Sequence, residues 1–70
     1  MNKQQVLENL RANIESESTT ADGHRWGCVY LDNARPKGMS ANQFRAILAQ
    51  LSKEGLYKVI DGYAFGDVRL

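Results

Sequence analysis

The feature that most constrains the fold of this 70-residue chain lies within residues 39–70. It is a capped amphipathic helix followed at once by the sequence signal for a β-hairpin. Ser40 is a typical N-cap residue, and Gln43 three positions later completes a capping box. Gly55 suits the left-handed position that ends a helix. Between these caps, apolar side chains recur at helical spacing at Phe44, Ile47, Leu48 and Leu51. The pattern predicts a helix over residues 40–54 with one buried face.

The hairpin signal is the Asp61-Gly62 pair between two apolar-rich runs. Asp-Gly favours a two-residue type I′ turn, because both central positions of that turn need a positive φ. The signal predicts two strands, over residues 56–60 and 63–70. In this register Gly66 lies opposite Tyr57 and leaves room for its ring.

The upstream half of the chain predicts a helix, a loop and a strand. Residues 1–16 carry a narrow apolar stripe at helical spacing, and residues 16–23 are polar turn formers expected to form a flexible loop. Residues 24–31 are aromatic and β-branched, as in a strand. Residues 32–38 are compatible with a short helix or a loop, since Pro36 disfavours helical backbone at the residue before it.

The predicted order is therefore α-β-(short α or loop)-α-β-β. Seventy residues suffice for one domain. We expect a single α+β domain over residues 1–70, in which residues 24–70 form the core unit and the helices pack on a three-stranded antiparallel sheet.

The net charge of +1 is close to neutral, but the basic residues are segregated. Residues 35–58 contain five basic residues against one acidic residue, a net of +4, whereas residues 1–34 contain three basic and five acidic residues. Positive charge thus gathers on the predicted helix of residues 40–54 and just before it. Such local clustering is one of the features expected of a surface that binds nucleic acid.

Several classes of protein are disfavoured by the sequence. Cys28 is the single cysteine, so no intrachain disulfide can form, and no apolar run is long enough to span a bilayer. The N-terminal residues also lack the apolar segment of a signal peptide, so we expect a soluble, cytoplasmic protein. His24 and Cys28 have no second pair of ligands and no orienting third group. We therefore expect no metal, no cofactor and no enzymatic activity.

Five residues have the types and spacing that a helix-turn-helix requires. Ala34 is small where two helices would cross, Gly38 can form the turn, and Met39 can plug the core. Phe44 and Ile47 would then anchor the second helix from within. This spacing resembles the helix-turn-helix motif. The continuation through a glycine cap into a strand is similar to the winged-helix branch of that family, as found in small bacterial and phage regulators.

The resemblance implies that the chain binds double-stranded DNA, with the helix over residues 40–54 in the major groove. Base contacts would come from outward residues near its N-terminal end, namely Asn42, Gln43, Arg45 and Ala46. Phosphate contacts would come from Arg35, Lys37, Ser40, Lys58 and Arg69. A homodimer would double these contacts and match a two-fold operator.

Two alternatives remain from the sequence. The first is a protein–protein interaction module of the same fold that binds no nucleic acid, since a fold does not determine a function. The second is stacking of single-stranded bases on the aromatic side chains; small domains more often use these residues in their core. The target sequence, any protein partner and the oligomeric state are not readable from the sequence.

Overall fold

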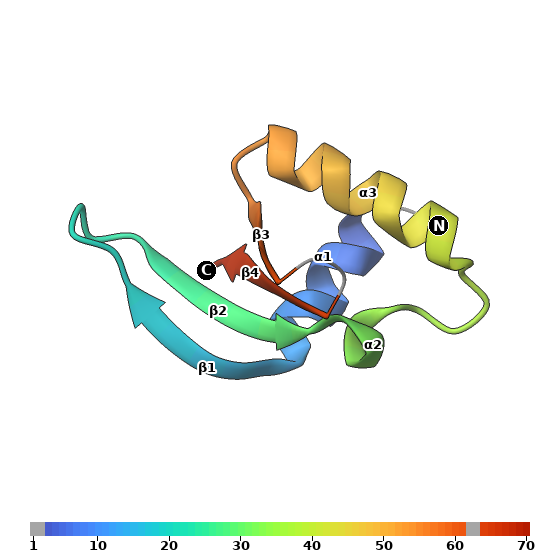
Figure 1. The fold of residues 1–70 in the computed structure, drawn as a ribbon, viewed down its shortest axis with the longest axis horizontal. Helices are drawn as coiled ribbons and strands as arrows, with labels where there is room; N and C mark the ends of the chain where they lie inside the picture. Colours follow the sequence, from blue (N-terminus) through green and yellow to red (C-terminus); the bar gives the residue numbers. More distant parts are fainter. Residues whose placement is uncertain (1–2, 62–63) are drawn as a thin grey trace.

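The computed structural model describes residues 3–61 and 64–70. Within them the chain forms, in order, α1 (Lys3–Ala12), β1 (Ile14–Thr19), β2 (Arg25–Tyr30), α2 (Leu31–Ala34), α3 (Ala41–Lys53), β3 (Tyr57–Asp61) and β4 (Phe65–Arg69) (Figure 1). The strands form one antiparallel sheet in the order β1-β2-β4-β3. The predicted α+β class is confirmed. The predicted sheet of three strands is wrong, because the described residues form four.

The helices and one face of the sheet share a single apolar core. Its sheet residues are Val29, Tyr57 and Val68, and its helical residues include Leu10 and Leu51. Trp26 is also buried but lies outside this cluster. Because side chains alternate along a strand, Trp26 lies on the opposite, helix-free face of the sheet.

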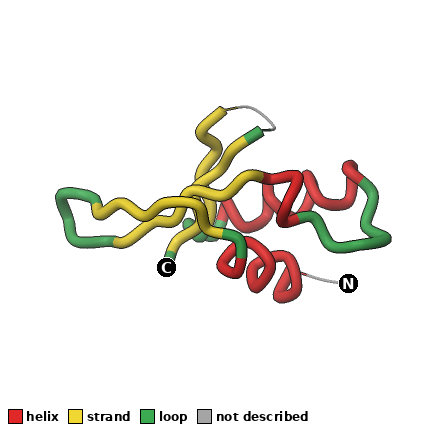
Figure 2. The backbone as a smooth tube through the Cα atoms, turned by 90° about the horizontal axis from the view of Figure 1, so that it is seen from below, coloured by secondary structure: helices red, strands yellow, loops and turns green. Residues whose placement is uncertain are grey.

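The unpredicted strand is β1, which occupies residues assigned from sequence to the end of a helix and to a flexible loop. Helix α1 stops at Ala12, and β1 pairs with β2 to form a long hairpin that extends away from the helices (Figure 2). The turn closes where the Gly23 N–H donates to the Thr20 carbonyl at 3.0 Å, with φ of 90° at Gly23. The sequence Asp22-Gly23 was the available signal for this hairpin.

The segment that the sequence left undecided is partly helix and partly turn. Helix α2 is only four residues long, and Arg35 after it has extended backbone, as expected before Pro36. The Met39 N–H then donates to the Pro36 carbonyl at 3.1 Å, and Gly38 has φ of 84°. Pro36 thus separates α2 from α3 by a tight connection.

Both predicted ends of α3 are confirmed. The Ser40 hydroxyl accepts from the Gln43 N–H at 3.1 Å, and the Gln43 side-chain oxygen accepts from the Ser40 N–H at 3.2 Å. At the other end, Gly55 has φ of 78° and the Leu56 N–H donates to the Leu51 carbonyl at 2.9 Å. These bonds satisfy backbone groups that a helix end otherwise leaves without partners.

Replacing Ser40 with alanine is expected to lower the free energy of unfolding by about 1 kcal/mol, because the Gln43 N–H loses its acceptor. Urea denaturation followed by circular dichroism measures the loss. Ser18→Ala, at an exposed position of β1, is the matched control. Equal losses in the two variants would contradict the role of the cap.

The register of the β3–β4 hairpin differs from the prediction. Tyr57 pairs with Val68 and Val59 with Gly66, and the register shifts between Val59 and Asp61. Residues 62 and 63 of the predicted turn lie outside the described residues. The predicted space for the Tyr57 ring is nevertheless confirmed, since the ring and its hydroxyl occupy the position that a β-carbon at Gly66 would take.

Candidate nucleic-acid interface

The outward face of α3 carries the side chains predicted to contact bases. Asn42, Gln43, Arg45 and Ala46 are all exposed, whereas Phe44, Leu48 and Leu51 on the other side of the helix are buried. Helix α3 runs along one side of the molecule, and no other element covers its outer side (Figure 1). The helix is therefore held by its inner face and leaves its polar face accessible.

The residues assigned to packing roles are placed as predicted. Ala34, Met39 and Phe44 are buried, and Ile47 packs against the same core while remaining partly exposed. Gly38 has the left-handed backbone predicted for the turn. These positions fix the N-terminal end of α3 relative to the segment before it.

Ser40 and Gln43 use their side chains to cap α3. The Gln43 amide oxygen accepts from the Ser40 N–H, so its side chain is held against the helix terminus. A glutamine held in this way does not reach a base edge. Of the four residues predicted to contact bases, Asn42, Arg45 and Ala46 therefore remain candidates.

Two of the predicted phosphate contacts lie beside this face. Arg35 and Lys37 are exposed in the connection that leads into α3. Arg35 and Arg45 line a common hollow of about 140 Å³, and Asp32 lies at the same hollow. Asp32 forms no ion pair with any residue in the described ranges, but its charge weakens the positive potential there.

The single acidic residue of the basic segment lies away from this hollow. Glu54 follows the last turn of α3, where its carboxylate accepts from Lys3 Nζ of α1 at 2.6 Å. Both side chains are partly exposed, so the pair adds little stability. It leaves the N-terminal end of α3 unaffected.

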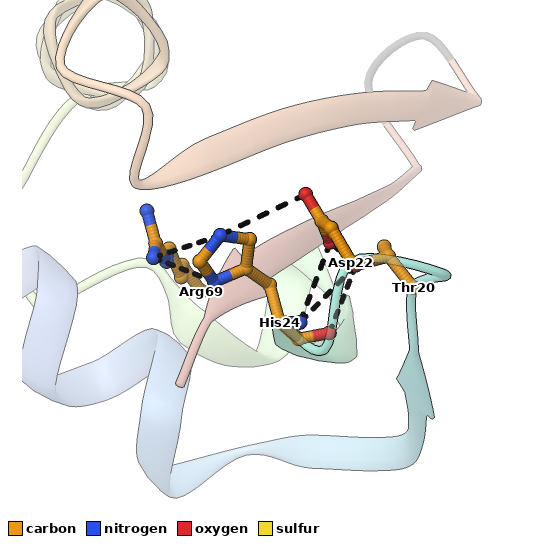
Figure 3. Close-up of polar contacts among 4 residues, drawn as sticks. All are labelled: Thr20, Asp22, His24 and Arg69. Atoms are coloured by element: carbon orange, nitrogen blue, oxygen red, sulfur yellow. Dashed lines mark hydrogen bonds and ion pairs between the residues drawn. The ribbon is translucent and has the colours of Figure 1, made fainter.

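Lys58 and Arg69 do not join the other basic residues. Lys58 Nζ lies 4.2 Å from the ring centroid of Trp26, on the helix-free face of the sheet. Arg69 Nη2 lies 2.7 Å from His24 Nδ1, close to the β1–β2 turn (Figure 3). The structure therefore places both side chains away from the outer face of α3.

The cluster around His24 connects the β1–β2 turn to β4. The Thr20 hydroxyl donates to the Asp22 carboxylate, and this hydrogen bond is the main reason why the pKa of Asp22 is lowered (Figure 3). His24 Nε2 lies 3.7 Å from Asp22 Oδ2. Because the Arg69 guanidinium can only donate, His24 Nδ1 is the acceptor in this contact. Within residues 3–61 and 64–70, no three ligating side chains gather into a metal site.

An apolar groove between α3 and β3 was missed by sequence reasoning. It has a volume of about 400 Å³ and is lined by Leu31, Arg45, Leu48, Ala49, Ser52, Tyr57 and Val59. The sequence contains no signal for the groove, because it depends on β3 being the outer strand of the sheet.

Comparison with known proteins finds no matching family model, no matching curated protein and no matching solved structure. No helix in the described part of the chain has the length and apolar character to cross a membrane.

Proposed function

We propose that this protein binds double-stranded DNA through the outer face of α3, as a small cytoplasmic transcription regulator of bacterial or phage origin. The observation that supports the proposal best is the placement of Asn42 and Arg45 on an uncovered helix face, next to the exposed basic residues Arg35 and Lys37. The order α1, β1, β2, α2, α3, β3, β4 agrees in part with that expected for a winged helix, from which it differs by the additional strand β1.

Each of these side chains has a defined role in the proposal. Arg45 would donate to a guanine edge and Asn42 would pair with an adenine, while Ala46 would contact a thymine methyl group. Arg35 and Lys37 would contact phosphates and set the position of the helix along the groove. With so few charges a monomer would bind weakly, and a homodimer would strengthen binding by doubling the contacts.

Fluorescence anisotropy with a mixed-sequence duplex tests the proposal. With the two phosphate contacts of Arg35 and Lys37, affinity should fall by about 12-fold between about 50 mM and about 200 mM salt. Arg45→Ala should weaken binding by about tenfold or more through the loss of a base contact. Lys37→Ala should reduce the slope of log affinity against log salt by about 0.9.

Arg25→Ala is the charge-matched control, because Arg25 Nη2 pairs with Glu17 Oε1 at 2.5 Å on the β1–β2 hairpin. It should leave affinity and salt dependence unchanged. If no binding occurs at micromolar duplex and low salt, or if Arg25→Ala weakens binding as much as Arg45→Ala, DNA binding through α3 is excluded.

Protein binding is the second candidate function. The apolar groove between α3 and β3 favours it, since such grooves on small domains commonly hold part of a partner. The absence of DNA binding in the experiment above would leave this candidate in place.

A further inference from the structure

Strand β3 is an open edge of the sheet, in the strand order β1-β2-β4-β3. Its Val59 and Ile60 side chains are 64% and 51% exposed, on an edge that no proline interrupts. Open edges normally avoid exposed apolar side chains, because unpaired backbone groups beside them attract other strands. Strand β3 also carries Lys58 and a register shift between Val59 and Asp61, features that protect an edge, so the exposed apolar side chains of Val59 and Ile60 are the part of this edge suited to pairing.

The backbone at Val59 faces outward. The Leu56 carbonyl accepts from the Arg69 N–H at 2.9 Å, which makes Leu56 and Arg69 a hydrogen-bonded pair. Hydrogen-bonded and non-bonded pairs alternate along antiparallel strands, so the Val59–Gly66 pair is non-bonded. The N–H and C=O of Val59 consequently point away from β4, toward the open edge.

The groove lies on the helix side of the same edge. Val59 borders it from β3, and Leu48 and Ala49 border it from α3. A strand added at Val59 would direct alternate side chains to this side, as in domains that bind peptides between a helix and an edge strand. The apolar lining fits an apolar side chain of such a strand.

The charge beside the groove indicates whether a segment of another protein or a second copy of this chain would occupy it. Arg45 lines the groove at the end nearer the start of α3, and Arg35 lies at the adjoining hollow. Asp32 at the same hollow offsets part of this charge, but two guanidinium groups against one carboxylate leave it net positive, so a partner segment with a carboxylate at this end would be favoured over a neutral one. A second copy of this chain, paired antiparallel through Val59, would instead bring its own basic α3 to the same side of the joined sheet. A second copy is therefore disfavoured as the occupant.

We propose that the β3 edge binds an extended segment of another protein, which pairs with Val59, inserts an apolar side chain between α3 and β3, and places an acidic residue beside Arg45. This inference does not depend on DNA binding. Because Arg45 belongs to both surfaces, an acidic peptide and DNA would compete for α3.

Selection from a random peptide library against the full chain, followed by calorimetry with the enriched peptides, tests the proposal. Enriched peptides should alternate apolar residues and carry an aspartate or glutamate on one side. Amide chemical-shift changes on binding should centre on Val59, Leu48 and Ala49.

Two substitutions, each with a matched control, locate the site. Val59→Pro removes the outward N–H and should weaken binding by about tenfold, whereas Val59→Thr keeps the N–H and should bind as the native chain does. Arg45→Glu should also weaken binding by about tenfold, and a peptide with lysine in place of its acidic residue should restore it. Lys53→Glu, the same charge change in the last turn of α3 but outside the groove lining, is the control.

Circular dichroism of each variant checks that the fold is retained. The proposal is overturned if selection enriches no peptide, or if folded Val59→Pro binds the peptides as well as Val59→Thr does. It is also overturned if sedimentation shows a dimer that excludes the peptides and dissociates in Val59→Pro, since the occupant is then a second copy.

Discussion

Replacing Gly66 with alanine is expected to lower the free energy of unfolding by about 3 kcal/mol. A β-carbon at Gly66 would overlap the hydroxyl and the ring of Tyr57, which is only 2% exposed and is enclosed by the core. The ring therefore cannot move aside without disturbing α3. A domain of this length has a total stability of about 4 to 10 kcal/mol, so a large part of it would be lost.

Urea denaturation measures this change, and Gly27→Ala is the matched control. A β-carbon at Gly27 would meet the Ile14 side chain at 2.6 Å, but that side chain is only partly buried and can shift. We expect a loss of about 1 kcal/mol in the control. In a Tyr57→Val background, Gly66→Ala should cost little, because the overlapping ring is absent. Similar costs in both backgrounds would show that the overlap is not the cause.

The sequence predicted α3 well because its determinants are local. The cap at Ser40, the apolar spacing and the terminal glycine at Gly55 lie within one stretch, and each acts on its near neighbours. The burial of Ala34, Met39 and Phe44 was likewise predicted from spacing alone. Local agreement of this kind makes such a helix readable from sequence.

Strand β1 could not be found from hydrophobic alternation. Of its six residues, Ile14 is partly buried and the other five are exposed, so the polar pattern matches a loop as well as a strand. The strand forms because β2 offers it a free edge and Gly27 leaves room for the Ile14 side chain. Both conditions arise from distant parts of the chain.

The positions of the basic residues of the candidate site likewise depend on distant parts of the chain and could not be predicted from the sequence. Counting charge along the sequence grouped Lys58 with Arg45, although Lys58 lies over Trp26 on the opposite face of the sheet. Which face a strand residue occupies depends on the register, and a shift of one residue exchanges the faces. The register of β3 shifts between Val59 and Asp61, which the Asp-Gly signal did not reveal.

Raising the pH above 10 is expected to destabilise the protein through Tyr57. Burial, with a smaller contribution from the charge of Asp67, raises the pKa of Tyr57 from 10.0 to about 12. The unfolded chain therefore loses this proton at lower pH than the folded chain does. Stability from this group is complete below pH 10 and is lost as the pH rises toward 12, by about 1.4 kcal/mol at about pH 11.

Tyr57→Phe isolates this effect. The Tyr57 hydroxyl is buried and has no hydrogen-bond partner among the described residues, so its removal should not lower stability near neutral pH. Between about pH 8 and about pH 11 the variant should lose about 1.4 kcal/mol less than the native chain, as measured by urea midpoints. Tyr30→Phe, at an exposed tyrosine, should follow the native curve. If the stabilities of Tyr57→Phe and the native chain fall in parallel as the pH rises, the alkaline loss arises from other groups. The Tyr57 hydroxyl would then not be the buried acid that its packing against Gly66 implies.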